Sequence, residues 1–138
     1  MSYDEIRTAS VIRYPYLWLR EAARAETERR KSRPVTVGVR IARPSGDDLL
    51  ILFPITSQPP GPSRLAVEVP EMEKRRAGLD STVRLWIVLD EDNQDVVGQS
   101  FYLEPAPPLG RFSKAFFLPL LQKYIALRST VRHVNRLG

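Results

Sequence analysis

The sequence predicts a mainly β protein with some α-structure: a small twisted barrel or sandwich with one short inserted helix and a C-terminal helix. Short apolar segments recur through residues 8–105, and turn residues rather than long helices separate them. Helical periodicity is confined to the end of the chain. We expect residues 1–138 to form a single domain, with the barrel over about 8–105 and the C-terminal helix over about 113–134.

The first three strands are predicted from hydrophobic patterns. "SVIRYPY" (10–16) is a candidate for an edge strand or a strand end, because Pro15 has no amide hydrogen to donate. "PVTVGVRIA" (34–42) places a β-branched apolar residue at every second position. "LLILFPIT" (49–56) is almost continuously apolar, as expected for a strand that is covered on both faces. The intervening "PSGDD" predicts a hairpin turn.

Three further strands are predicted in the middle of the chain. "RLAVEVP" (64–70) and "TVRLWIVLD" (82–90) both alternate between apolar and polar residues. The turn-rich "DEDNQD" (90–95) is interpreted as a connection. It leads to a weaker candidate strand, "DVVGQSFYLE" (95–104).

Helices are predicted at two places. "PEMEKRRAGLD" reads as a single helical turn that starts at Pro70 and is capped by Gly78. Ser113 is a candidate N-cap for the C-terminal helix, in which Pro119 either causes a kink or marks the first turn. The apolar residues that follow at helical spacing are Phe117, Leu120, Leu121, Tyr124, Val131 and Val134. We expect this apolar stripe to pack on the barrel.

Composition limits the class of protein. A hydrophobic content of 43% with 27% charged residues is ordinary for a soluble globular protein. The absence of cysteine excludes disulfides, thiolate metal sites and a cysteine nucleophile. The N-terminal residues lack the apolar core of a signal peptide, and no apolar run approaches the roughly 20 residues that span a bilayer. We therefore expect a cytoplasmic protein with no membrane association.

The charge balance favours a polyanionic partner without establishing one. Lysine and arginine number 21 against 16 aspartates and glutamates, which gives a net charge of +5 and a pI of about 9.9. Most of the positive charge is arginine, whose planar guanidinium suits phosphate. A basic protein with no such partner would carry the same surplus, so both interpretations remain open.

Most standard catalytic sites are absent from the sequence. There is no glycine-rich phosphate loop and no Ser/His/acid order. His133 is the only histidine, and we expect it to be structural or solvated. The acidic run over 90–95 does not match a calcium loop, because Asp95 occupies the glycine position and Phe101 the glutamate position. We predict no metal and no cofactor.

Two segments remain as candidate sites. "REAARAETERRKSRPV" (20–35) mixes arginine with glutamate, and the proline after Arg33 holds that residue extended at the start of a strand. "PITSQ" (54–58) ends an apolar strand with three uncharged hydrogen-bonding side chains, and prolines fix its exit. An ordinary strand-to-turn transition and a salt bridge from Arg33 to Glu26 or Glu28 would explain both segments without a site.

The order of four segments resembles the PemK/MazF family of toxin endoribonucleases. These segments are "SRPVTV", "LLILFPITSQ", "AGLDSTVRLWIVL" and "LGRFSKAFFLPLL", and the resemblance covers roughly residues 8–125. Members of the family are SH3-like barrels whose second strand opens with Arg-Pro and in which a later strand ends in Pro-x-Thr-Ser or a similar motif. The resemblance implies an SH3-like, PemK/MazF-type twisted β-barrel.

The resemblance also implies a sequence-selective endoribonuclease that cleaves single-stranded RNA without a metal. Transesterification would leave 2′,3′-cyclic phosphate and 5′-hydroxyl ends. The family's catalytic arginine maps onto Arg33 and its catalytic threonine onto Thr56. Further candidates for contacts to phosphate or bases are Ser57, Gln58, Arg29, Arg30, Lys31, Arg75 and Arg76.

Partners follow from the resemblance in the same way. It implies a growth-inhibiting hydrolase of a toxin–antitoxin system, with RNA as substrate. It further implies a homodimer with a basic groove across its interface, restrained by a small acidic antitoxin.

Two departures from the family pattern favour an alternative function. The first strand, "ASVIRYPYL", lacks the usual Gly-Asp, and the loop before Arg33 contains no glycine, which limits its access to positive φ. A non-catalytic SH3-like module that binds nucleic acid or a protein is therefore the alternative. A scaffold protein whose arginines bind nothing specific is the third interpretation.

Overall fold

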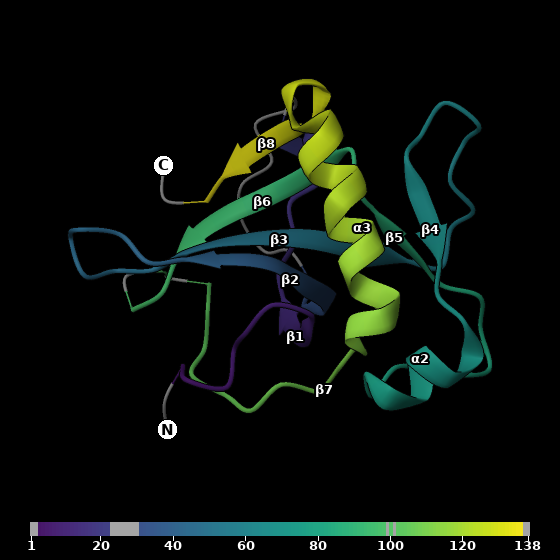
Figure 1. Ribbon diagram of the computed structural model, residues 1–138, viewed down its shortest axis with the longest axis horizontal. Helices are drawn as coiled ribbons and strands as arrows, with labels where there is room; N and C mark the ends of the chain where they lie inside the picture. Colours follow the sequence, from purple (N-terminus) through teal and green to yellow (C-terminus); the bar gives the residue numbers. More distant parts are fainter. Residues whose placement is uncertain (1–2, 23–30, 99, 101, 137–138) are drawn as a thin grey trace.

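A curled antiparallel sheet dominates the computed structural model, which describes residues 3–22, 31–98, 100 and 102–136 (Figure 1). The sheet contains eight strands in the described ranges and forms a half-barrel, so the fold is mainly antiparallel β with a few helices. The elements are β1 (Ser10–Tyr14), α1 (Leu19–Ala22), β2 (Arg33–Ile41), β3 (Leu49–Thr56), β4 (Ala66–Glu68), α2 (Glu71–Arg76), β5 (Trp86–Val88), β6 (Glu91–Val96), β7 (Gly110–Arg111), α3 (Lys114–Leu127), a 3₁₀ turn (Arg128–Thr130) and β8 (Arg132–Asn135).

Strand β3 is the centre of the sheet. One of its edges pairs with β2, which continues through β1 to β7. The other edge pairs with β6 over its first half and with β5 at its end. Because β5 leads on to β4 and β6 to the parallel strand β8, the sheet diverges into two branches on this side. The predicted covering of β3 on both faces is confirmed, since every residue from 50 to 55 is buried.

Strand β2 bends where its pairing with β3 changes register, between Val37 and Val39. Gly38 lies at this bulge, and a Cβ atom there would come within 2.3 Å of the Phe53 ring. Glycine is therefore required because the neighbouring ring occupies the space of a side chain.

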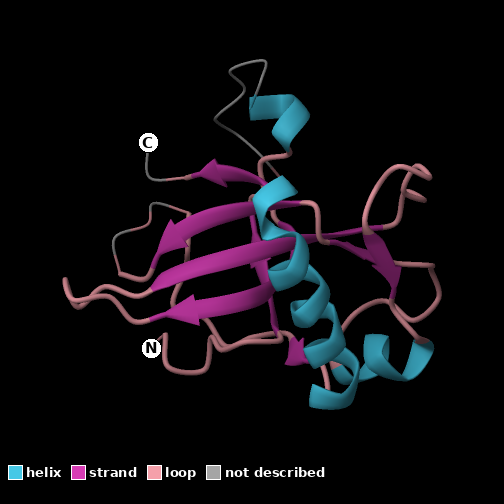
Figure 2. Cartoon of the chain, turned by 45° about the horizontal axis from the view of Figure 1, so that its top comes forward, coloured by secondary structure: helices cyan, strands magenta, loops and turns pink. Residues whose placement is uncertain are grey.

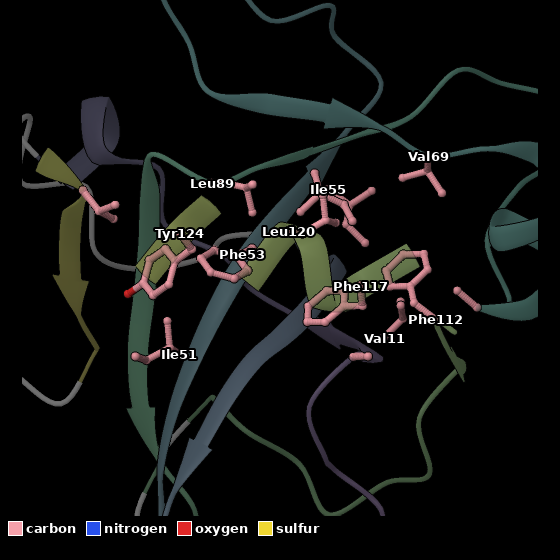
Figure 3. Close-up of a cluster of buried hydrophobic side chains, with 14 residues drawn as sticks. Val11, Ile51, Phe53, Ile55, Val69, Leu89, Phe112, Phe117, Leu120 and Tyr124 are labelled. Carbon is pink, nitrogen blue, oxygen red and sulfur yellow. The ribbon is translucent and has the colours of Figure 1, made fainter. Parts of the chain in front are cut away.

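Two apolar clusters lie on opposite faces of β2 and β3. The first is covered by α3, which lies across the sheet in two views (Figures 1 and 2). In it Phe53 and Tyr124 meet edge to face at 4.8 Å, while Phe117 stacks on Phe112 (Figure 3). The second cluster includes Val35 and Val37 together with the aromatic residues of 14–18. Successive residues of β3 thus belong alternately to the two clusters, whereas β2 changes from the second cluster to the first at its bulge.

Helix α2 and the start of α3 are tied together by polar contacts and close backbone packing. Glu73 accepts hydrogen bonds from the Ser113 amide (2.9 Å) and hydroxyl (2.8 Å), and Ser113 caps α3 through the Phe116 amide, as predicted. Gly78 ends α2 with φ of +72° against the Leu109 carbonyl. These contacts fix the segment that follows α2.

Two predictions for the second half of the chain are wrong. Residues 90–95 do not form a turn: β6 (Glu91–Val96) lies inside the sheet, and no strand covers 97–104 within the described residues. The C-terminal helix ends at Leu127 rather than near 134, and residues 132–135 form β8. Pro119 lies inside α3, whereas Val131 and Val134 are buried from the extended chain beyond it.

The error over β6 has a clear physical reason: its polar side chains are buried but hydrogen-bonded. Asn93 accepts from the Leu17 amide (2.8 Å) and donates to the Leu17 carbonyl (2.7 Å). Glu91 accepts from the Tyr16 hydroxyl and the Leu19 amide. Hydrophobic periodicity does not detect a strand whose polar side chains are buried because they form hydrogen bonds.

No helix in the described ranges has the length and apolar character needed to cross a membrane.

Candidate functional site

Arg33 and Thr56 lie at adjacent strand ends. Val35 of β2 pairs with Pro54 of β3, and continuing this register by two residues places Arg33 opposite Thr56. Both residues line a cavity of about 410 Å³ at this end of the sheet, together with Ser57 and Gln58. Arg33 from the first candidate segment and Thr56 to Gln58 from the second therefore share one cavity.

The Thr56 hydroxyl is oriented by its own turn. Its Oγ1 accepts a hydrogen bond from the Gln58 backbone amide at 3.0 Å. Within the described part of the chain, no group accepts the hydroxyl proton, so Thr56 retains a donor for a ligand. The half-buried side chain is thus held in place by a backbone contact while its hydrogen remains available.

Arg33 is exposed at the first position of β2. Of the ion pairs formed among the described residues, none includes Arg33. The alternative partners Glu26 and Glu28 lie outside the described residues, so the predicted salt bridge to either one stays a prediction. Arg33 therefore presents a guanidinium to the cavity beside Thr56.

The segment after α2 also lines the cavity. It contributes Gly78, Leu79, Asp80, Val83 and Leu85. The Asp80 carboxylate accepts from the Thr82 hydroxyl (2.6 Å) and amide (2.9 Å), and these hydrogen bonds lower its pKa. Asp80 is therefore ionised near neutral pH and adds a negative charge to the lining of this cavity.

A second cavity of about 180 Å³ adjoins the first. Arg33, Thr56 and Gln58 line both. The second cavity also includes Trp18, Arg20, Arg64, Val88 and the exit of the strand at 59–61. The arginine–threonine pair consequently lies where two hollows meet.

Arg13 and Arg20 also line these cavities, although neither was among the predicted contact residues. Arg13 is exposed on β1 and enters the first cavity because β1 pairs with β2 opposite Pro34. Arg20 stacks over the Trp18 ring at 4.9 Å and enters the second cavity. Arg20 begins the candidate segment 20–35, whereas Arg13 had no signal beyond the general excess of arginine, because the strand order that brings it here cannot be read from local sequence.

Several predicted contact residues lie elsewhere or are not described. Arg75 and Arg76 are on α2, outside both cavities, and they pair with Glu71 and Glu73. Lys31 is exposed before β2 and lines neither cavity. Arg29 and Arg30 lie outside the described residues.

His133 has a structural contact rather than a place in the cavities. Its Nδ1 lies 2.8 Å from the buried Asp92 carboxylate. Over the described ranges, no cluster of three or more histidine, aspartate and glutamate side chains is arranged to hold a metal ion.

Comparison with known proteins gave no relative. No protein-family model matches the chain, and no match was found among curated proteins or solved structures. Any function of this site therefore rests on the residues that form it.

Proposed function

We propose that the protein is a metal-independent endoribonuclease of PemK/MazF type that cleaves single-stranded RNA at the cavity shared by Arg33 and Thr56. The observation that carries this proposal is the meeting, at adjacent strand ends, of a guanidinium and a hydroxyl donor that have no ion-pair or acceptor partner among the described residues. The SH3-like character of the barrel and the family membership are parts of the same proposal.

Cleavage at this site requires stabilisation of a charged phosphorane. The ribose 2′-oxygen attacks the adjacent phosphorus and loses its proton to solvent. The bond to the 5′-oxygen breaks, and that oxygen takes a proton from solvent. Arg33 neutralises the charge that develops on the non-bridging oxygens through paired hydrogen bonds, and the Thr56 hydroxyl donates to the same phosphate.

The direct test is RNA cleavage by the purified protein in the presence of EDTA. Arg33→Ala should lower the cleavage rate by about 100-fold or more, because removal of one preorganised donor has an effect of this order. Arg33→Lys should restore only part of the rate, since lysine cannot form the planar pair of hydrogen bonds. The products should end in 2′,3′-cyclic phosphate and 5′-hydroxyl groups.

The matched control is Arg43→Ala, which removes an exposed arginine from the turn between β2 and β3. Cleavage by Arg33→Ala at the rate of the parent protein, or equal loss in Arg43→Ala, would refute the assignment. Growth inhibition on induced expression, dependent on Arg33, would support the proposed toxin role. A homodimer and an acidic antitoxin belong to the same proposal.

A second candidate function is a non-catalytic module that binds nucleic acid or a protein through the same cavities. The observation that favours it is the absence of a histidine among the described residues that line the two cavities. Asp80, the acidic residue of the first cavity, is already engaged by Thr82. RNA binding that weakens steeply with salt, without any cleavage products, would support this function.

A further inference from the structure

The cavities at the candidate site continue into a third. It has a volume of about 470 Å³ and shares Arg20 and Arg64 with the second cavity. The second cavity in turn shares Arg33 and Thr56 with the first. Three hollows with common walls therefore follow one another, and Arg132 of β8 lies in the last.

The acidic side chains of the third cavity are already paired. Arg64 forms a bidentate pair with Asp90 (2.7 and 2.8 Å) and reaches Glu91 at 2.9 Å. These hydrogen bonds raise the pKa of Arg64, which therefore stays charged. The single charge of Arg64 offsets one of the two carboxylates, and Arg20 and Arg132 leave the third cavity with a net positive charge.

The other arginines of the row have no such neighbours. Arg13, Arg33 and Arg132 form no ion pair with any residue in the described ranges, and Arg20 contacts the face of Trp18. Glu91 also holds the segment of Arg20 in place, since it accepts a hydrogen bond from the Leu19 amide at 3.0 Å. A succession of positive charges without ion-pair partners among the described residues therefore lines the three hollows.

We propose that this row binds single-stranded RNA over several nucleotides, from Arg13 past Arg33 and Arg20 to Arg132. The inference rests on the proposed function and extends it, because it assigns phosphate contacts to Arg20 and Arg132, which lie outside the first cavity. A basic groove that follows the backbone is typical of single-strand binding, whereas reading a duplex requires an element that protrudes into its grooves.

The test uses 2′-O-methyl oligouridylates of 4 and 12 nucleotides, which cannot be cleaved because the 2′-oxygen is blocked. Binding to the full-length protein is followed by fluorescence anisotropy at several salt concentrations. The double variant Arg20→Ala/Arg132→Ala should bind the 12-mer about 10-fold more weakly. The slope of log affinity against log salt should decrease by about 1.4, which is two phosphate contacts at roughly 0.7 each. Affinity for the 4-mer should change less.

The control is again Arg43→Ala, with circular dichroism to verify the fold of each variant. Parental affinity and slope in the double variant, or an equal loss in Arg43→Ala, would overturn the inference. So would binding of a poly-glutamate peptide without binding of the 12-mer. If the 12-mer binds through Arg20 and Arg132 but no RNA is cleaved, the groove stands and the nuclease fails. If RNA is cleaved but the double variant binds the 12-mer as the parent does, the nuclease stands and the groove fails.

Discussion

Thr56 shows how a single residue at a strand end is prepared for a ligand. Its oxygen accepts from the Gln58 amide, so the side chain is oriented before any ligand arrives. Thr56→Val keeps the shape of the side chain and removes the donor, and we expect it to lower RNA cleavage by about 100-fold. Thr56→Ser should remain within a few-fold of the parent. Single-turnover kinetics measure both, and parental rates in Thr56→Val would contradict the role.

A second prediction at the scale of single residues concerns how Asp92 makes the stability of the protein depend on pH. Its fully buried carboxylate contacts the Tyr124 hydroxyl (2.9 Å) and His133 Nδ1 (2.8 Å). Burial raises the pKa of Asp92 despite the hydrogen bond from His133, and the charge of Glu91 acts in the same direction. A raised pKa in the folded state means stability that is present at low pH and lost as pH rises through that pKa.

Asp92→Asn removes this titration and keeps an oxygen for Tyr124. The free energy of unfolding of the variant, relative to the parent, should therefore increase as pH rises from the ordinary aspartate pKa through the raised pKa of Asp92. Urea denaturation at a series of pH values measures the difference. A difference that is constant or decreases with pH would contradict the assignment.

The sequence could pair Arg33 with Thr56 only through the family resemblance, and the structure places both on one cavity. Arg13 and Arg20 could not be found in the same way. Their positions depend on which strands pair and on the hydrogen bonds that hold 16–19 against β6, and neither follows from local patterns.

At the scale of elements, β6 replaces apolar packing with hydrogen bonds. Glu91, Asn93 and Asp95 alternate along the strand and all meet residues of 14–19, while Asp92 faces α3 and β8. The strands of clear periodicity, β2 and β3, were predictable because burial there is apolar. The extent of α3 was not, because Val131 and Val134 keep an apolar spacing in a chain that is no longer helical.

Asn93→Leu tests the contribution of β6 to stability. The substitution preserves the approximate volume but leaves the amide and carbonyl of Leu17 buried without partners. We expect a loss of about 2–4 kcal/mol in the free energy of unfolding, from two unsatisfied backbone groups. Urea denaturation measures the loss, with the exposed Gln122→Leu on α3 as a control that should change stability by less than about 0.5 kcal/mol. Equal stability of both variants would contradict this account of β6.

At the scale of the whole molecule, the two apolar clusters share their strands. Residues of β3 belong alternately to the cluster under α3 and to the cluster around Tyr14 and Tyr16, and β2 contributes to both because of its bulge. Hydrogen bonds from β6 to 14–19 join segments more than 70 residues apart in the sequence. Loss of either cluster removes one face of the same sheet, so we expect both to unfold together, as one domain.

The two tryptophans provide separate probes of this cooperativity. Trp18 belongs to the second cluster and lies edge to face with Tyr16, whereas Trp86 is on β5 beside Arg84. In Trp86→Phe the fluorescence reports on Trp18, and in Trp18→Phe it reports on Trp86. For each variant, the urea midpoint from fluorescence should equal the midpoint from far-UV circular dichroism, even if the substitution lowers stability. A fluorescence midpoint distinct from the dichroism midpoint in either protein would show that the branch of β4 and β5 unfolds independently of the sheet that carries β1 and β2.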